Sequence, residues 1–403
     1  MHTLNHRRRA RRKHYVWMVL GLAAATFARP ALVAAASPTL PPALPSDEQA
    51  VARLLAIAGE GFKIHETDHF TIAYDTPYEV LHPLIDRLEG TYDTIRRFCE
   101  VSGLNVEPPA LRLEVILFDR YEDFARYAAG VGMPVESIAG FYHQEVNIAA
   151  FCNTLCSPDL QRITRQIEKI QKQLAQLKKE GSGAQASRQQ RQDLQRTLST
   201  LRMQRNALVK RFNRFVIQHE AAHQVLFNLG VHVRGAKNPD WLVEGLACQF
   251  EVRQADSGGT LQRVNQMRLA DLREAFRVGP NAKSISDDAY REAFESGRLV
   301  LLVDLIGDRE LFTRRDSNIA FRYAQAWALV YYLHREHRKA LADYLRRLGA
   351  RRPGEIVDRR REVEDFQSVF GELDEAFQRH WITYMLRLRF DPQEAGGVWK
   401  DEG

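Results

Sequence analysis

The sequence predicts an α+β protein with a mixed-sheet upper lobe, a helical lower lobe and an inserted antiparallel coiled-coil hairpin. Three observations lead to this prediction. Strand-like segments, of which 111–118 is the clearest, lie before residue 152. After residue 252, apolar residues repeat mostly at helical spacing. Between 159 and 212, leucines and isoleucines recur at steps of three and four, as in a heptad seam.

Seven segments follow from composition and periodicity. They are 1–36, a signal peptide; 37–61, a Pro-rich linker and a short helix; 62–157, the α+β upper lobe; 158–212, the basic hairpin; 213–256, two helices that carry the motifs described below; 257–390, the helical lower lobe; and 391–403, a loose tail.

Individual elements are predicted from the period of the apolar residues. Strands are expected at 69–74, 111–118, 138–143 and 146–151. Outside the hairpin, helices are expected at 47–58, 78–101, 121–129, 261–278, 287–295, 298–306, 317–334, 338–348 and 363–388.

The first 36 residues are typical of an export signal. A basic RRRARRK stretch precedes an apolar run over 15–27, and small residues at 34–36 offer a cleavage site. An exported protein is therefore expected, in the periplasm, in the cell envelope or secreted. The alternative is an uncleaved membrane anchor, but the run before Arg29 is short for a span of about twenty residues.

Net charge argues against nucleic-acid binding once this segment is set aside. The chain has 57 Lys and Arg and 51 Asp and Glu. Seven of the basic residues and none of the acidic ones lie in 1–36, which leaves 50 basic against 51 acidic residues. The high pI therefore comes from the signal segment and gives no evidence for a nucleic-acid partner.

The hairpin concentrates positive charge. Residues 159–211 contain thirteen Lys or Arg and four Asp or Glu, a net charge of +9. A solvated surface on a structural spacer is one interpretation. The other is a docking arm for an anionic partner, such as a membrane face, a wall polymer or a protein. The segment has no nucleic-acid motif and no aromatic stacking set.

Four cysteines are present, and an exported location permits disulfides. Cys152 and Cys156 close a small loop and are the expected pair if one forms. Cys99 and Cys248 are expected to be buried thiols, because a free Cys behaves as a small apolar residue.

An HExxH pattern, His-Glu-Ala-Ala-His, begins at His219. No Gly or Pro interrupts the segment before Gly230, which is expected to end a helix. Residues four apart lie on one helix face, so His219 and His223 can present two imidazole nitrogens to one metal ion. Glu220 lies beside them, where it suits a general base acting on a metal-bound water.

A catalytic zinc site takes three protein ligands and keeps one open position. The third candidate is Glu244, in the segment Trp-Leu-Val-Glu-Gly-Leu-Ala that begins at Trp241. A Pro-Asp pair before this segment indicates the start of a second helix, with Glu244 in its first turns. His232 is a fallback ligand.

HEAAH, a gap of twenty residues between His223 and Glu244, and WLVEGLA together resemble the gluzincin branch of the zincin metallopeptidases. They are most similar to a peptidase-MA-like group of largely uncharacterised bacterial exported proteins with HExxH followed by WLxEGxA. Leu229 stands where a metzincin would have its third His. The resemblance implies one zinc ion per chain held by His219, His223 and Glu244, with Glu220 as the base.

The resemblance also implies two features of substrate binding. In zincins an edge strand of the upper lobe pairs with the substrate backbone, and residues 146–150 are the candidate here. The alternative is that this strand only packs within the sheet. A Tyr after the metal site supports the oxyanion in aminopeptidase-like members, and Tyr323 matches that position. Tyr323 could equally be a core residue, and His232 or His334 could supply the donor instead.

Zinc-dependent hydrolysis of a peptide or protein substrate is the expected activity. The alternative is a catalytically inactive zincin-fold binding or scaffold module of the cell envelope. Retention of Glu220, which a scaffold does not need, favours the enzyme. Hydrolysis of non-peptidic amides would use the same residues. The sequence leaves open the oligomeric state and the choice between endopeptidase and exopeptidase.

Overall fold

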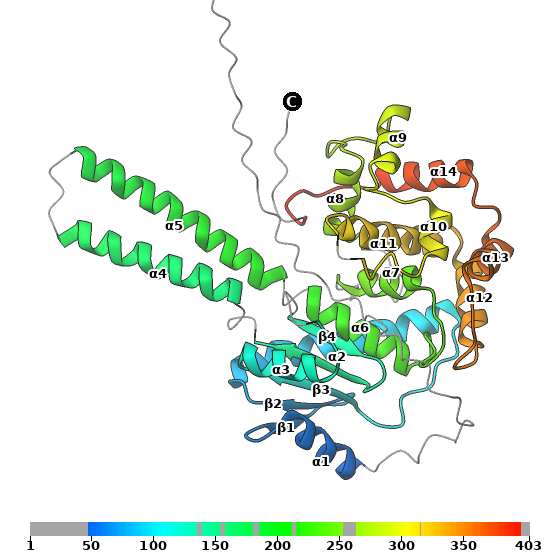
Figure 1. Ribbon diagram of the computed structural model, residues 1–403, viewed down its shortest axis with the longest axis horizontal. Helices are drawn as coiled ribbons and strands as arrows, with labels where there is room; N and C mark the ends of the chain where they lie inside the picture. Colours follow the sequence, from blue (N-terminus) through cyan, green and yellow to red (C-terminus); the bar gives the residue numbers. More distant parts are fainter. Residues whose placement is uncertain are drawn as a thin grey trace, which may run out of the picture.

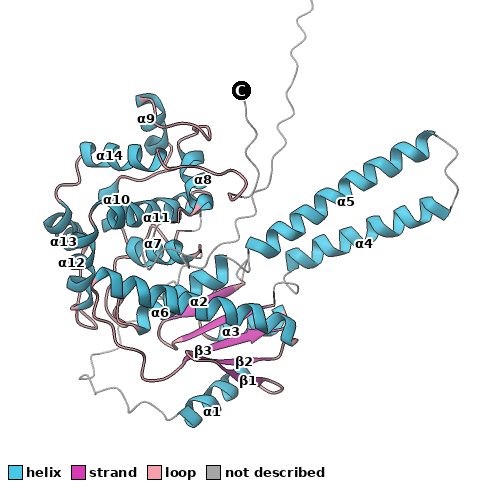
Figure 2. Ribbon diagram, turned by 180° about the vertical axis from the view of Figure 1, so that it is seen from behind, coloured by secondary structure: helices cyan, strands magenta, loops and turns pink. Residues whose placement is uncertain are grey.

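A five-stranded mixed sheet and 14 helices make up the described part of the chain (Figures 1 and 2). The computed structural model describes residues 47–134, 139–153, 158–179, 185–211, 215–252, 263–314 and 316–395. The predicted signal segment, most of the linker and the end of the tail lie outside them. None of the described helices is both long and apolar enough to span a membrane.

The sheet has the strand order β1-β2-β3-β5-β4. β2, β3 and β5 run parallel, while β1 and β4 are antiparallel edge strands. The register pairs Ile72 with Val115, Val115 with Ala149, and Ala149 with Tyr142. The strands are β1 Lys63–Glu66, β2 Phe70–Tyr74, β3 Leu113–Phe118, β4 Gly140–His143 and β5 Ile148–Cys152.

The edge-strand prediction was wrong. The candidate 146–150 falls mostly on β5, which lies inside the sheet between β3 and β4. β4 precedes β5 in the chain and pairs with its outer side, so β4 is the edge strand on this side in the described residues. The N–H of Cys152 donates to the C=O of Ala139, and alternation then directs the backbone groups of Gly140 and Tyr142 away from β5.

Both faces of the sheet are covered by helices, which explains why the central strands are mostly apolar. The buried Glu114 of β3 is paired with Arg53. α2 (Tyr78–Ser102) and α6 (Ile217–Asn228) pack on one face, while α1 (Asp47–Ala58) and α3 (Tyr121–Gly130) pack on the other. Buried side chains alternate between the two faces: Ile72, Val115, Leu117, Ala149 and Phe151 on the first; Ala73, Ile116, Phe118, Ile148 and Ala150 on the second.

The remaining helices form the second lobe, with α11 buried at its centre. One hydrophobic core continues from the sheet through α6 and α7 to α11 and α14. The helices are α7 Asp240–Phe250, α8 Gln266–Ala275, α9 Asp287–Glu295, α10 Leu302–Gly307, α11 Ile319–Glu336, α12 Arg338–Gly349, α13 Arg359–Phe370 and α14 Glu375–Leu386.

α4 (Pro158–Lys179) and α5 (Gln185–Arg211) lie side by side and project from the body as an arm (Figures 1 and 2). Ile167, Ile170 and Leu198 are buried between them, as the seam predicts. Coiled-coil geometry stays a prediction. Residues 212–214, between α5 and the helix that carries HEAAH, lie outside the described residues.

Four element predictions need correction. The helix expected at 261–278 is shorter: α8 begins at Gln266, after the capping Asn265, and ends at Ala275. The single helix over 363–388 is two helices, because Gly371 adopts φ +91° and the Asp374 carboxylate caps α14 by accepting from the N–H of Phe377 at 2.8 Å. α10 begins only at Leu302, so 298–301 are not helical. β1 was missed because its sequence, Lys-Ile-His-Glu, shows no apolar run.

Cys99 and Cys248 are buried free thiols, as predicted. Cys152 is buried in β5. Cys156 lies outside the described residues, so the expected pairing stays a prediction.

We expect Gly245→Ala to destabilise the protein by about 1–3 kcal/mol, because a side chain there overpacks the contact between α7 and α11. A Cβ at Gly245 would lie 2.6 Å from the carbonyl oxygen of Ala326 and 2.6 Å from Cγ2 of Val330. Urea unfolding measures the change.

Gly90→Ala is the matched control for this prediction. Gly90 is also helical, in α2, but a Cβ there meets nothing within 4 Å. This variant should be about 0.5–1 kcal/mol more stable, because Ala is the better helix former. Equal effects of the two variants would contradict the close helix contact.

Candidate metal centre

α6 carries the HExxH pattern and is buried from Ile217 to Phe227, because it lies between the sheet and α7. Its polar side chains have defined partners. Nε2 of Gln224 donates to the C=O of Glu114 at 2.8 Å, which ties α6 to β3. The helix ends as predicted at Gly230, which adopts φ +77°, and the N–H of Val231 donates back into the last turn.

α7 brings Glu244 against α6. The helix begins after Pro239, and its Trp241 packs against the rings of Tyr344 and Phe366. The connecting loop is held by Asn238, whose side chain bonds to the N–H and C=O of Val233 at 3.0 and 2.9 Å. These contacts fix where Glu244 enters the core.

His219, His223 and Glu244 converge as the sequence predicted. Nε2 of His219 lies 3.1 Å from Nε2 of His223 and 3.1 Å from Oε2 of Glu244. Nε2 of His223 lies 3.4 Å from the same oxygen. Donor atoms arranged tetrahedrally about 2.0–2.1 Å from a zinc ion would be about 3.3 Å apart. The three side chains therefore fit one such ion.

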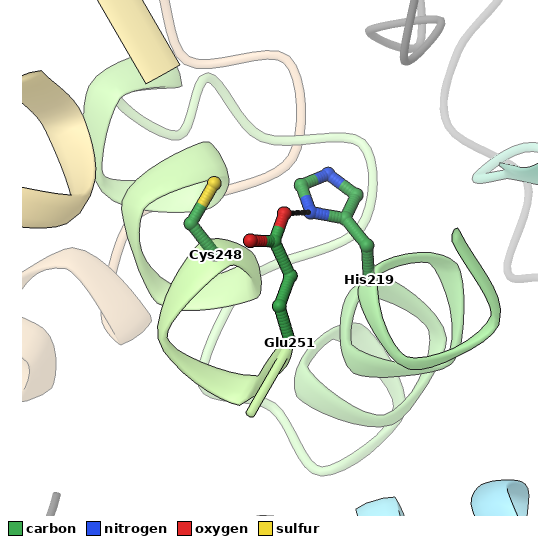
Figure 3. Close-up of side chains that lie close together, drawn as sticks. All are labelled: His219, Cys248 and Glu251. Atoms are coloured by element: carbon green, nitrogen blue, oxygen red, sulfur yellow. Dashed lines mark hydrogen bonds and ion pairs between the residues drawn. The ribbon is translucent and has the colours of Figure 1, made fainter. Parts of the chain in front are cut away.

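Hydrogen bonding favours Nε2 of His219 as a ligand atom. Its Nδ1 lies 3.0 Å from Oε1 of Glu251, and the carboxylate of Glu251 meets the ring of His219 in Figure 3. An ionised carboxylate only accepts, so Nδ1 carries the proton and Nε2 has a lone pair in the neutral ring. This lone pair faces Oε2 of Glu244, so a proton or a metal cation must lie between them.

Glu251 belongs to a supporting network that the sequence analysis missed. Its carboxylate accepts from Nε of Arg268 at 3.0 Å, from Nδ2 of Asn265 at 2.7 Å and from a second nitrogen of Arg268. Carboxylates behind a metal-binding His fix its tautomer and orientation. The available signal was spacing: Glu251 follows Glu244 by two helical turns on the same face.

A second group of ligand atoms, from His219, Cys248 and Glu251, also lies within 4.8 Å of one another. Figure 3 shows Cys248 beside the contact between Glu251 and His219. This group is less suited to a metal. Both oxygens of Glu251 are engaged by Arg268, and burial raises the pKa of the Cys248 thiol to about 11. Metal binding by Cys requires the thiolate.

The electrostatic environment of His219, His223 and Glu244 favours a bound cation. Burial alone would raise the pKa of Glu244, but the charge of His223 and hydrogen bonds from both imidazoles lower it below its ordinary value. Burial lowers the pKa of His219, but its hydrogen-bonded neighbours, first Cys248 and then two carboxylates, raise it well above its ordinary value. The same carboxylates would stabilise a divalent ion.

Glu220 lies beside these side chains without binding to them. Its Oε2 accepts from the backbone N–H of Tyr142 in β4 at 3.0 Å. Its Oε1 is buried and has no hydrogen-bond partner among the described residues. Burial raises the pKa of Glu220 to about 7, against the opposing charges of His219 and His223. The backbone contact with Tyr142 has no sequence signal.

Tyr323 lies near the centre, and His334 does not. The ring of Tyr323 is 6.0 Å from that of His219, and the Arg268 guanidinium lies 5.3 Å from it. His334 follows eleven residues later on α11, about 16 Å along the helix axis, and packs against Phe98.

His232 is close to the centre but belongs to neither group of ligand atoms among the described residues. Its ring packs 5.1 Å from that of Phe227. Burial, followed by the charge of His223, lowers the pKa of His232 to about 3, so the ring is neutral at physiological pH.

Residues 214–355 match a family model described as a protein of unknown function (DUF1570). The match spans α6 to α12 and thus includes the candidate metal centre and Tyr323. No curated protein and no solved structure matched the chain significantly.

We expect one divalent metal ion per chain, and we expect His223→Ala to lose it because only two ligands remain. His232→Ala is the matched control, since it removes a neighbouring buried imidazole that is not a ligand. Metal content by mass spectrometry, after dialysis against zinc, distinguishes the two. Loss of the ion from both variants would contradict this ligand set.

Proposed function

We propose that this protein is an exported zinc-dependent peptidase with a zincin-like fold of the gluzincin type. The observation that carries the proposal is the convergence of His219, His223 and Glu244 beside a buried carboxylate, Glu220. The fold proposal draws support from the antiparallel edge strand β4, followed in sequence by the HExxH helix and the Glu244 helix.

Zinc is the proposed metal because two imidazoles and one carboxylate are a frequent ligand set of catalytic zinc. When bound, zinc would supply a Lewis acid that polarises a carbonyl group and acidifies a water molecule. His219 and His223 would hold the metal from one helix face, and Glu244 would complete the ligand set from α7. Glu251 keeps His219 in the required tautomer.

Glu220 is the proposed general base. Oε2 is fixed by the N–H of Tyr142, and Oε1 is left to take a proton from the attacking water. The water oxygen bonds to the carbonyl carbon, and Glu220 then passes the proton to the nitrogen as the C–N bond breaks. Burial raises the pKa of Glu220 to about 7, which suits both transfers.

Tyr323 is the proposed donor to the developing oxyanion. Tyr323 belongs to α11, and its ring is a neighbour of both the ring of His219 and the guanidinium of Arg268. Burial raises the pKa of Tyr323 well above its ordinary value, so the hydroxyl keeps its proton and can donate it in a hydrogen bond.

β4 is the proposed substrate-pairing strand, and it replaces the candidate 146–150 from the sequence analysis. The sheet does not use the outward backbone groups of β4 at Gly140 and Tyr142, of which the N–H of Tyr142 donates to Glu220. An extended peptide paired with this edge would pass beside Glu220, which is hydrogen-bonded to Tyr142. The catalytic and ligand residues are at most 6% exposed, so a substrate must displace part of the surrounding packing.

Glu220→Gln tests the base. Because Gln cannot take up the proton, hydrolysis of a casein or mixed-peptide substrate should fall about 10²–10⁴-fold or more. Zinc content should be unchanged, since Glu220 is not a ligand, and the Gln carbonyl can still accept from Tyr142. A variant that cleaves as fast as the parent would refute the mechanism.

Tyr323→Phe tests the oxyanion donor. Loss of one such donor typically lowers kcat about 10²–10³-fold. We expect this drop with little change in KM or in zinc content, measured by steady-state kinetics. An unchanged kcat would assign Tyr323 to core packing. Tyr331→Phe, on the same helix but outside the centre, is the control and should retain full activity.

A further inference from the structure

α4 carries a row of basic side chains in addition to its apolar seam. Arg162, Arg165, Lys169 and Lys172 repeat at steps of three, four and three, and all four are exposed. We call them the basic stripe. Glu168 is the only acidic residue between the first and the last of them. Among the described residues, Arg165, Lys169 and Lys172 form no ion pair.

The basic stripe lies on the outer side of the arm. Each stripe residue follows a seam residue by two positions, as Arg165 follows Ile163 and Lys169 follows Ile167. Two residues correspond to about 200° around a helix, so the stripe is opposite the face that packs on α5. The eleven residues from Arg162 to Lys172 span about 15 Å, with neighbouring charges roughly 5 Å apart along the axis.

Charge is separated between the arm and the rest of the chain. Residues 159–211 have a net charge of +9. From residue 37 onward, the remaining chain has 37 basic and 47 acidic residues, a net charge of −10. The arm projects from the body, so its outer side is accessible to a large, flat partner (Figures 1 and 2).

We propose that the arm binds the surface of anionic phospholipid membranes through the basic stripe. A straight, rigid row of charges can contact a planar array of phosphate groups simultaneously, whereas a flexible polyanion would first have to be ordered along it. The stripe contains no apolar side chain, so binding is electrostatic, at the level of the headgroups. This inference does not depend on the proposed peptidase activity.

The magnitude of binding follows from the charge. One Lys or Arg near an anionic membrane raises the partition coefficient roughly fivefold, so three raise it about a hundredfold. Screening acts over about 8 Å at physiological ionic strength, and binding should therefore weaken steeply as salt is added.

Vesicle co-sedimentation of the full chain tests the proposal. The vesicles contain phosphatidylglycerol and phosphatidylcholine in equal parts, or phosphatidylcholine alone. Substituting Arg165, Lys169 and Lys172 together by Gln should lower the partition coefficient on the anionic vesicles about a hundredfold. The matched control replaces Arg188, Arg196 and Arg202, which are exposed on α5, and should lower it less than tenfold. Far-UV circular dichroism verifies that each arm remains helical.

Three outcomes would overturn the proposal. The first is equal loss in both triple variants, which would assign binding to net charge. The second is undiminished binding of the stripe variant, which would place the membrane contact elsewhere in the chain. The third is stripe-dependent binding to polyphosphate without binding to anionic vesicles, which would make the partner a soluble polyanion.

Discussion

The close approach of α6 and α7 is the contact on which the candidate site depends. It brings two imidazole nitrogens and one carboxylate oxygen within 3.1–3.4 Å of one another in the protein interior. Buried groups of this kind are costly unless a proton or a cation joins them. A divalent ion would satisfy all three atoms together.

Packing around the two helices maintains this approach. Gly245 lets α7 lie directly against α11, whose Tyr323 then faces His219. α8 contributes Arg268, which neutralises the buried Glu251 behind His219. The sheet contributes the N–H of Tyr142 to Glu220. Helices of the second lobe and an edge strand of the first thus meet at one cluster, while the arm lies apart from it.

Elements with strong periodicity could be predicted from the sequence, and weakly patterned ones could not. α1, α9 and the two arm helices follow from apolar spacing, and β3 follows from its apolar run, which only Glu114 interrupts. β1 shows no such pattern, because an edge strand buries little. The sequence does contain signals for the break at Gly371, namely the glycine itself and the capping Asp374. The break was missed because apolar residues continue at helical spacing on both sides of it.

The sequence was sufficient to identify the candidate ligands, because HExxH places two imidazoles on one helix face whatever surrounds them. It also determined the charge of the arm and its apolar seam. The folded structure was needed to establish that Glu244 reaches both imidazoles, that Glu251 and Arg268 lie behind His219, and that β4 is the edge strand beside Glu220. Most of these contacts join side chains that are distant in sequence, and the contact of Glu220 with β4 uses a backbone N–H. A local sequence pattern specifies neither kind of contact.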